Sequence, residues 1–404
     1  MPTLLQINTT LNSGSTGRIV EQISLLAKSK GWDCYIAHGA RYVNKSQIKS
    51  IQIGTKFENL IHAGLGEFLG LHGFGSTLAT YLFIHKIKKL KPDVIHLHNI
   101  HGYYLNIKVL FDYLAKRNIP VVWTLHDCWA FTGHCTHFEL KGCEKWKTEC
   151  GDCSLLMAQY KSRFFDRTRK NYLIKKGLYA KQNNLTIIPV SGWLSNLVSQ
   201  SILKQHTIKV IYNGIDLNSF KPTPNDVKVR LGISDDKKMI LGVVASGFGM
   251  EKGKREFIEY SKNPKYQIVI IGLADKDKRD LPSNIICINR IHSQAELAEY
   301  YTAADVFLNP TYNDTLPTTN LEALACGTPV ITYRTGGSPE TLDANTGVVV
   351  PQGNIEAMAK AIEFVISNGK KYYAKACRER IEKLYNKDER FEDYIILYNE
   401  LLQH

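Results

Sequence analysis

Short apolar runs alternate along the chain with segments of mixed polarity. The first run occupies residues 3–9, and similar runs recur as PDVIHLHN, IPVVWTLHD, MILGVVASG and QIVIIGL. The intervening segments, such as IVEQISLLAKSKG at residues 19–31, have the apolar spacing of amphipathic helices. Regular exchange of strand-like and helix-like segments predicts an α/β fold with mostly parallel sheets.

The length of 404 residues predicts two domains, because a single core rarely grows to this size. A linker is expected in KVIYNGIDLNSFKPTPND at residues 209–226, where two prolines follow each other closely. We therefore place an N-terminal domain at residues 1–215 and a C-terminal domain at residues 216–384. An amphipathic helical tail ends the chain.

The segment richest in candidate chemistry is NPTYNDTLPTTNLEALACGTPV at residues 309–330. Its Leu-Pro-Thr-Thr turn is followed by capping side chains, Thr318-Thr319-Asn320, and a helical run, and free N–H groups at a helix start attract phosphate oxygens. Glu322, one turn later, would accept hydrogen bonds from a ribose, and Asp314 would hold hydroxyls of a second sugar. The alternative is a turn-forming aspartate and a surface glutamate. Together these features predict a nucleotide-sugar site.

The strands DVIHL and VVWTL both end in polar side chains. His98 and Asn99 follow the first strand, and His126 and Asp127 follow the second. Ligands of open parallel sheets bind beyond the carboxyl ends of the strands, so we expect these four side chains on one rim. A purely structural role for the histidines is the alternative.

Charge is unevenly distributed between the two halves of the chain. Residues 1–216 contain 27 Lys and Arg against 13 Asp and Glu, whereas residues 217–404 contain 24 against 25. The excess predicts an anionic partner for the N-terminal half, such as a phospholipid surface, a lipid-diphosphate acceptor or nucleic acid. A solvated surface that only keeps the protein soluble is the alternative.

Residues 161–181 predict contact with a membrane surface. They combine many Lys and Arg residues with an aromatic and aliphatic stripe, a combination that suits the headgroup region of an anionic bilayer. Packing on the sheet explains the stripe, and membrane contact would explain the excess of basic residues. The chain has no apolar run of about 20 residues, and its start lacks the basic region of a signal peptide. We therefore expect a cytoplasmic protein that is peripheral on the inner face of the cell membrane.

Five of the nine cysteines lie between Cys128 and Cys153. The last four have the spacing C-x7-C-x6-C-x2-C and are Cys135, Cys143, Cys150 and Cys153. In a reducing compartment such clustering favours a metal over disulfides, and four thiolates would form a structural zinc site that ties down a long loop. Partly buried free thiols or a disulfide remain the alternatives.

Six motifs, in their order and spacing, resemble the retaining glycosyltransferases of family 4. These are LLQINTTLNSGSTGR, DVIHLHN, VVWTLHD, IYNGIDLNSF, MEKG and the segment at residues 309–330. The resemblance extends over nearly the whole chain and implies the GT-B fold, an α/β architecture of two Rossmann-like doubly wound domains facing a central cleft. It also implies that a helix at about residues 385–404 returns to the N-terminal domain.

The resemblance implies a role for each candidate residue. The candidate catalytic residues are His126, Lys252, Asp314 and Glu322. The candidate donor-binding residues are Gly14, Gly17, Ser246, Arg290, Leu316, Pro317, Thr318 and Glu322. The candidate acceptor-binding residues are Arg18, His98, Asn99 and Asp127.

Two positions depart from the pattern of the family. Asp314 stands where the family usually has glutamate, so the carboxylate is one methylene shorter. Ser246 or Gly247 occupies the place of a common arginine. One phosphate contact is therefore missing or is supplied by Lys254 or Arg255.

The preferred function is a retaining, metal-independent glycosyltransferase with no cofactor for catalysis. The donor would be a UDP- or GDP-sugar, and the acceptor a lipid-linked glycan of surface polysaccharide assembly. Asp275-x-Asp277 lies in a lysine-rich stretch that predicts a surface turn rather than a metal site. The alternatives are an epimerase-like nucleotide-sugar enzyme on the same fold and a basic nucleic-acid-binding protein. No nucleic acid partner is expected, because no base-stacking module is evident.

Overall fold

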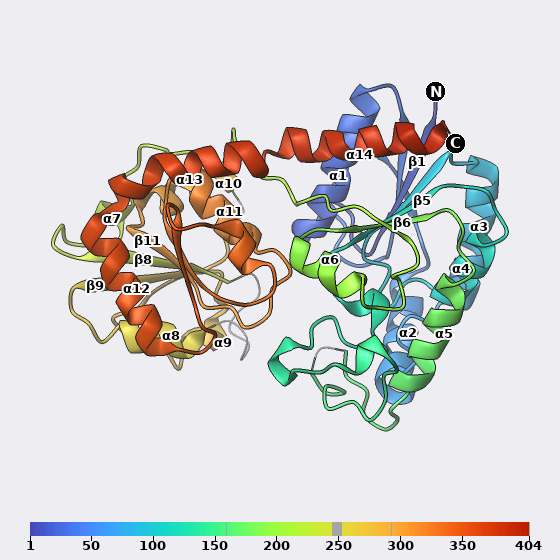
Figure 1. Ribbon diagram of the computed structural model, residues 1–404, viewed down its shortest axis with the longest axis horizontal. Coiled ribbons are helices and arrows are strands. Elements are labelled where there is room, and N and C mark those ends of the chain that lie inside the picture. Colours follow the sequence, from blue (N-terminus) through green and yellow to red (C-terminus); the bar gives the residue numbers. More distant parts are fainter. Residues whose placement is uncertain (159, 245–252, 292, 404) are drawn as a thin grey trace. The chain divides into compact units, whose positions relative to one another are not determined.

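The computed structural model describes the chain except for residues 159, 245–252, 292 and 404 and the side chain of Lys276. Its backbone forms two compact units (Figure 1). Unit 1 contains residues 1–212 and 391–404, and unit 2 contains residues 213–390. Each unit has its own parallel sheet with helices around it, so the predicted α/β class is confirmed.

The sheet of unit 1 has seven strands in the order β3-β2-β1-β4-β5-β6-β7, and each described pairing is parallel. Its strands are β1 (Thr3–Asn8), β2 (Asp33–His38), β3 (Lys49–Gln52), β4 (Val94–Leu97), β5 (Val121–Leu125), β6 (Leu185–Pro189) and β7 (Thr207–Ile208). Strands β4, β5 and β6 are buried along their whole length, which is why continuous apolar runs reveal them in the sequence.

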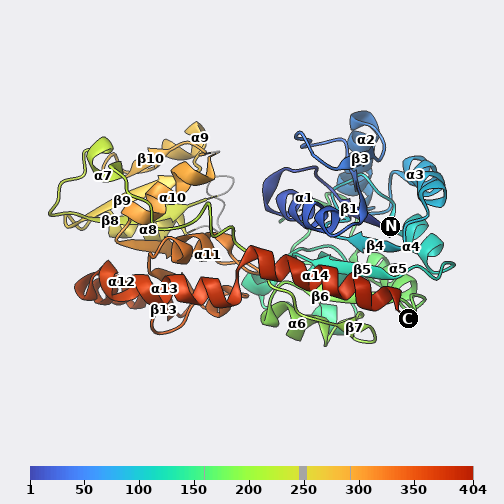
Figure 2. The same cartoon turned by 90° about the horizontal axis from the view of Figure 1, so that it is seen from above.

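Helices cover both faces of this sheet (Figures 1 and 2). They are α1 (Gly14–Ser29), α2 (Lys56–Leu69), α3 (Thr77–Leu90), α4 (Ile107–Leu114), α5 (Thr168–Tyr179), α6 (Gly192–Val198) and the end of α14 (Lys387–Leu402). Three short 3-10 turns, η1 (Trp129–Phe131), η2 (Glu139–Lys141) and η3 (Lys145–Lys147), lie in the long connection between β5 and α5.

Neighbouring residues of β5 point into two different cores. Val122 belongs to the apolar cluster that the sheet shares with α1 and α14. Trp123 points to the other face, where its ring contacts Phe111 of α4 and Tyr179 of α5 at centroid distances of 5.5 and 5.4 Å. The last helix of the chain therefore completes the core of unit 1 on one side, and α4 and α5 complete it on the other.

The sheet of unit 2 has six parallel strands in the order β10-β9-β8-β11-β12-β13. They are β8 (Lys238–Val243), β9 (Tyr266–Ile271), β10 (Ile286–Ile288), β11 (Val306–Asn309), β12 (Val330–Tyr333) and β13 (Gly347–Val350). The helical elements are α7 (Val227–Arg230), α8 (Lys254–Tyr260), α9 (Asp275–Lys278), α10 (Gln294–Ala303), α11 (Thr318–Ala325), η4 (Ser338–Thr341), α12 (Ile355–Asn368) and α13 (Lys370–Leu384).

Each sheet reverses its winding beside its first strand. In unit 1 the chain builds outward from β1 through β2 and β3, and then returns to place β4 on the other side of β1. In unit 2 it builds outward from β8 through β9 and β10, and then places β11 on the other side of β8. The carboxyl ends of such strand pairs are the points where open α/β sheets bind ligands.

Two segments differ from their predicted structures. The five glycines between residues 64 and 75 indicate a mobile loop in the sequence. Instead, α2 starts with a capping box of Thr55 and Glu58, continues through Leu69 and ends at Gly70 in the left-handed conformation. The basic segment at residues 161–181 is helical only in α5. In the described part of the chain, no helix combines the length and the apolar character that a membrane crossing requires.

Candidate functional site

Residues 310–317 connect β11 to α11 beside the switch point of unit 2. Leu316 and Pro317 are buried in this loop. Pro317 precedes α11 in an extended conformation, and no side chain caps the helix. The predicted capping by residues 318–320 is wrong, because the helix begins at Thr318 itself. The first-turn N–H groups thus have no side-chain acceptor at the N-cap, an arrangement that suits an anion.

Glu322 lies one turn into α11 and is half-buried. The hydroxyl of Tyr301, at the end of α10, donates a hydrogen bond to Glu322 Oε2 at 2.8 Å. Burial raises the pKa of Tyr301 well above its ordinary value, so this hydroxyl stays a donor at neutral pH. Asp314 is also half-buried, and its backbone carbonyl accepts the N–H of Gly337 at 3.3 Å. Both predicted carboxylates therefore lie at the carboxyl end of the sheet, on backbone that is held in place.

Glu256 of α8 supports this loop and was missed in the sequence. Its side chain is buried, and its Oε1 accepts hydrogen bonds from Tyr312 at 2.7 Å and from Tyr333 at 2.8 Å. Tyr312 belongs to the β11–α11 loop, so a buried carboxylate fixes that loop to α8. In the sequence Glu256 follows Lys254 and Arg255 and cannot be told apart from an exposed helix residue.

Lys370 at the start of α13 fixes the backbone of Tyr301, the residue that is hydrogen-bonded to Glu322. Its ammonium donates to the backbone carbonyls of Tyr301 at 3.3 Å and Ala304 at 3.1 Å, and to Thr328 Oγ1 at 2.7 Å. Burial lowers the pKa of Lys370 to about 8, and the carbonyls at the end of α10 are suitable partners for a cation. Lys370 was also missed, because nothing in the sequence indicates that it is buried.

The glycine at the start of α8 lies against the β11–α11 loop. Gly253 has φ +72°, and a Cβ built on it would lie 2.1 Å from Pro310 Cγ. The connections that follow β8 and β11 therefore meet, as the switch point requires. The predicted phosphate residues Ser246 and Lys252 lie outside the described residues. Lys254, named as a substitute, is paired with Asp280 at 3.1 Å.

Arg290 is the remaining candidate donor contact in unit 2. It is exposed and follows β10, the edge strand, at the same end of the sheet as the β11–α11 loop. Strand β9 lies between β10 and β8, so the sheet places Arg290 away from the switch point. The predicted surface turn with Asp275 and Asp277 forms the short helix α9, in which Asp275 pairs with Lys278 at 2.9 Å.

The two strand-end histidines of unit 1 lie side by side. His98 Nδ1 is 3.2 Å from His126 Nε2, and His98 Nε2 is 2.8 Å from Gln6 Oε1. The Gln6 oxygen can only accept, so His98 carries its proton on Nε2 and its Nδ1 accepts from His126 Nε2–H. Asn99 lies next to them, and its N–H donates to Asn8 Oδ1 at 3.3 Å. The Nδ1 atom of His126 is consequently an acceptor.

Burial keeps this histidine pair neutral. Desolvation lowers the pKa of His126 to about 4 and that of His98 well below its ordinary value. At neutral pH both imidazoles are uncharged, so neither can act as a general acid. Both still donate a hydrogen bond through Nε2–H. A cavity of about 10 Å³ borders the pair, so in this conformation the strand ends are closely packed.

Asp127 already has partners for both carboxylate oxygens. Its Oδ2 is 2.8 Å from His101 Nε2, and its Oδ1 accepts the N–H of Trp129 at 2.9 Å. Tyr160 contacts His101 Nδ1 in turn at 2.6 Å. Burial raises the pKa of Asp127, but the attraction and hydrogen bond of His101 outweigh this and bring it to about 2. His101 and Tyr160 are thus further members of this rim that the motifs did not indicate.

The loop after β1 contains two glycines that were predicted to contact the donor, Gly14 and Gly17, and only Gly17 is closely packed. A Cβ on Gly17 would lie 2.7 Å from Thr10 Oγ1, so this position needs glycine for space. Gly14 opens α1 with φ +69° and has free space around it, so it needs glycine only for its backbone conformation. Arg18, the next candidate, is exposed on α1. This loop and the strand end at His98 flank the switch point between β1 and β4.

The four clustered cysteines do not form a ready metal site. Cys135 and Cys153 are hydrogen-bonded to each other, which raises the pKa of Cys135 and lowers that of Cys153 to about 7. Cys150 Sγ accepts the N–H of Gly133 at 3.3 Å. Within the described residues, no group of three or more His, Cys, Asp and Glu side chains is arranged to hold a metal ion. The four cysteines are free thiols in the structure, and the zinc site stays a prediction.

Metal analysis would decide between these alternatives. If the four thiolates bind zinc, the purified protein should contain about one zinc per chain, and a strong chelator or Cys150→Ser should expose the connection around η2 and η3 to protease. Cys287→Ser, at a half-buried cysteine of unit 2, is the matched control and should change neither result. Absence of zinc together with the loss of two titratable thiols would show a disulfide instead.

Comparison with known proteins identifies the family. The model "Glycosyltransferase Family 4" matches residues 31–219, and the model "Glycosyl transferases group 1" matches residues 227–384. The protein named "Putative colanic acid biosynthesis glycosyl transferase WcaC" of Escherichia coli K12 is 23% identical over 375 residues, which cover 87% of this chain and 88% of that protein.

Solved structures match the fold over its full length. Sucrose-phosphate synthase from Thermosynechococcus elongatus superposes with a TM-score of 0.75 at 20% identity and covers 100% of both chains. HepE from Anabaena, in complex with UDP-glucose, has a TM-score of 0.65 at 14% identity and covers 99% of this chain and 100% of its own. Since the two family models together account for most of its length, the chain belongs to the family 4 glycosyltransferases of GT-B fold.

Proposed function

We propose that this glycosyltransferase moves a sugar from a UDP- or GDP-sugar to a lipid-linked glycan during surface polysaccharide biosynthesis. The observation that carries the donor assignment is the uncapped start of α11 at the switch point of unit 2, with Glu322 one turn behind it. The names of two similar proteins support the proposal further. One is a putative colanic acid glycosyltransferase, which supports the role in polysaccharide biosynthesis, and the other is a complex with UDP-glucose, which supports the nucleotide-sugar donor.

In this proposal unit 2 binds the donor. The diphosphate lies at the N-terminus of α11, where the helix dipole contributes about 0.3–1 kcal/mol and up to about 2 kcal/mol when partly buried. Glu322, fixed by Tyr301, accepts hydrogen bonds from the ribose, and Asp314 accepts them from the donor sugar. Lys252 would add a positive charge at the diphosphate.

Transfer would proceed with retention and without a catalytic metal ion. The bond between the anomeric carbon and the diphosphate oxygen breaks, and the acceptor oxygen forms its bond on the same face of the sugar. The departing diphosphate takes the acceptor proton, so no enzymatic nucleophile is needed. His126 would contact the sugar beside the anomeric carbon, and its Nδ1 atom would accept a hydrogen bond from a sugar hydroxyl, because its Nε2–H is used by His98.

Binding of the donor can be tested before the acceptor is known. A saturating nucleotide-sugar, at about 100 times its Kd, adds about 2.7 kcal/mol to the stability of the unit that binds it, which corresponds to a rise of about 5–10 °C in Tm. We expect this shift with a UDP- or GDP-sugar in a thermal melt. A shift with DNA or RNA and none with any nucleotide-sugar would contradict the proposal.

The reaction itself requires a panel of donors and lipid-diphosphate sugars. Mass spectrometry should detect a product one sugar heavier, NMR should show that its anomeric configuration equals that of the donor, and a chelator should leave the rate unchanged. An epimerised donor without transfer would indicate the epimerase alternative. An inverted product would exclude retention while leaving the donor assignment intact.

A further inference from the structure

A row of polar side chains crosses the core of unit 1 near the carboxyl ends of β1, β4 and β5. Its members, which we call the polar row, are Gln6, His96, His98, Thr124 and His126. Side chains two residues apart on a strand point to the same face, so the two histidines of β4 line up, as Thr124 and His126 do at β5. The first four members are at most 1% exposed, and burial of polar groups costs free energy unless each finds a partner.

Helix α14 supplies the partners at one end of the polar row. The hydroxyl of Tyr398 lies 2.6 Å from His96 Nδ1, and the hydroxyl of Tyr394 lies 3.0 Å from Thr124 Oγ1. His96 Nε2 is in turn 2.8 Å from Thr124 Oγ1. Both tyrosines are at most 2% exposed, and burial raises the pKa of each, so both hydroxyls stay protonated. Helix α14 therefore reaches into the polar row through two phenol groups.

The directions of these hydrogen bonds follow from what each atom can do. Among the described residues the Tyr398 hydroxyl has no other hydrogen-bond partner, and a buried donor without an acceptor is costly, so it donates to His96 Nδ1. His96 then carries its proton on Nε2 and donates to Thr124 Oγ1. Burial lowers the pKa of His96 well below its ordinary value, which leaves one ring nitrogen able to accept. Tyr398 thus selects the tautomer of a buried imidazole.

The other end of the polar row is the strand-end histidine pair. The His96 and His98 rings pack at a centroid distance of 4.0 Å, and His98 Nδ1 accepts from His126 Nε2–H at 3.2 Å. Gln6 fixes His98 at its other nitrogen, because the Gln6 amide nitrogen donates to Ser24 Oγ at 2.6 Å and so turns Oε1 toward the ring. His126 is half-buried at the strand end, and it is the one member of the row that is not enclosed in the core.

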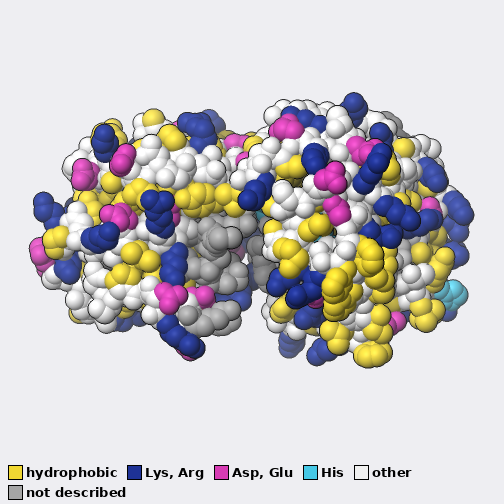
Figure 3. Space-filling model, turned by 90° about the horizontal axis from the view of Figure 1, so that it is seen from below, with side chains coloured by type: hydrophobic (Ala, Val, Ile, Leu, Met, Phe, Trp, Pro, Cys, Tyr) yellow, Lys and Arg dark blue, Asp and Glu magenta, His cyan; other side chains and the backbone are white. Residues whose placement is uncertain are grey.

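The hydrogen bonds distinguish this row from the other buried histidines of unit 1. Figure 3 shows little histidine on the face of the molecule that it draws, whereas Lys, Arg and hydrophobic side chains are abundant there. His72 is buried as well, but neither of its ring nitrogens has a partner among the described residues. Both ring nitrogens of His96 and of His98 have partners. A buried network whose members are satisfied holds them in one arrangement.

We propose that Tyr398 and His96 are positioning residues for His126 in sugar transfer. The inference rests on the proposed function, in which His126 contacts the sugar beside the anomeric carbon. Tyr398 fixes His96, the packed His96 ring fixes His98, and His98 holds the Nε2–H of His126, so that Nδ1 stays available for the sugar. A displacement of about 1 Å at a reacting centre can lower a rate by about 10²-fold, which gives a rigid support of this kind its kinetic value.

Tyr398→Phe tests the proposal, because it removes one hydroxyl and little volume. We expect kcat to fall by about threefold to tenfold while the KM for the donor stays unchanged, since unit 2 binds the donor. Thr124→Val should cause the same loss, and Thr124→Ser, which keeps the hydroxyl, should retain the wild-type kcat. In a His126→Ala background Tyr398→Phe should change kcat by less than about twofold, because its effect passes through that imidazole.

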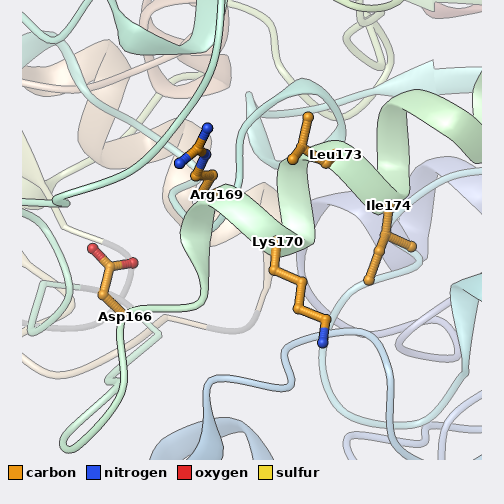
Figure 4. Close-up of a pocket in the computed structure, with 5 residues that line it drawn as sticks. All are labelled: Asp166, Arg169, Lys170, Leu173 and Ile174. Carbon is orange, nitrogen blue, oxygen red and sulfur yellow. The ribbon is translucent and has the colours of Figure 1, made fainter.

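Tyr172→Phe is the matched control. The Tyr172 hydroxyl donates to the Trp146 carbonyl at 3.0 Å and its side chain is 1% exposed, so this variant also loses one buried hydrogen bond. Tyr172 belongs to α5, and an open cavity of about 440 Å³ beside that helix is lined by residues outside the polar row (Figure 4). Both tyrosine variants should lower the melting temperature by about 2–8 °C, but Tyr172→Phe should leave kcat unchanged. An equal loss of kcat in both would show a merely structural role and overturn the proposal.

NMR of the imidazole nitrogens gives a readout that does not require transfer. In the wild type His96 and His126 should both carry the proton on Nε2, and Tyr398→Phe should shift the ring signals of both, whereas Tyr172→Phe should shift neither. A response confined to His96, in an enzyme that transfers sugar normally, would overturn the inference alone. A wild type that transfers no sugar, with a His126 signal that responds to Tyr398→Phe, would contradict the proposed function and confirm that Tyr398 supports His126.

Discussion

Replacing Glu322 with alanine is expected to lower kcat/KM for sugar transfer by about 10²–10³-fold or more while unit 2 stays folded. The carboxylate is half-buried one turn into α11, and Tyr301 fixes one of its oxygens at 2.8 Å. Its loss removes the proposed ribose acceptor and leaves the buried Tyr301 hydroxyl without this partner. The second effect should cost about 1–3 kcal/mol in the free energy of unfolding. Initial rates over a range of donor concentrations, with a thermal melt, measure both.

Glu322→Gln separates charge from position. The amide oxygen still accepts from Tyr301, so the stability should recover, but a neutral amide is a weaker acceptor for ribose hydroxyls and activity should stay low. Glu363→Ala, at an exposed glutamate of α12, is the matched control and should leave both quantities unchanged. If Glu322→Ala retained activity within about twofold, the assignment of this residue would be wrong.

The fold class could be predicted because of how parallel sheets bury their strands. Strands such as β5 and β6 are covered on both faces, so they appear in the sequence as continuous apolar runs. The order of the strands within each sheet could not be predicted from the apolar runs. The return of the chain from β3 to β4, and from β10 to β11, depends on long-range packing that no local pattern records.

The candidate site was predictable where a motif lies on a strand end or a helix start. His98 and His126, 28 residues apart, are brought within 3.2 Å by parallel neighbouring strands. The residues that hold the site were not predictable. Glu256 and Lys370 are charged side chains inside helices, and their burial comes from elements distant in sequence. The aromatic and aliphatic stripe of α5 does pack inside unit 1, where Tyr172, Leu178 and Tyr179 are buried, because an apolar stripe at helical spacing most often faces the core.

The neutral histidines of unit 1 should make that unit sensitive to acid. Burial lowers the pKa to about 4 for His62, His126 and His134, to about 3 for His72, and well below the ordinary value for His96 and His98. The unfolded chain binds protons on these residues near pH 6.5, whereas the folded unit binds them only near pH 4 or lower. Stability is therefore fully present above about pH 6.5 and falls as the pH drops toward 4, by up to about 1.4 kcal/mol per pH unit for each histidine.

Tryptophan fluorescence can follow this loss in unit 1 alone, because all five tryptophans of the chain lie there. Denaturant midpoints should decrease steadily as the pH falls from 6.5 to 4, and the decrease should continue below pH 4 because the pKa of His72 is lower still, at about 3. His72→Phe should weaken the dependence, since both ring nitrogens of His72 are buried without a hydrogen-bond partner among the described residues, and phenylalanine of similar shape cannot be protonated. His85→Gln, at an exposed position of α3, should leave the slope as it is. A midpoint independent of pH across this window would mean that the imidazoles are solvated or paired with acids in solution, and would contradict their burial as neutral side chains.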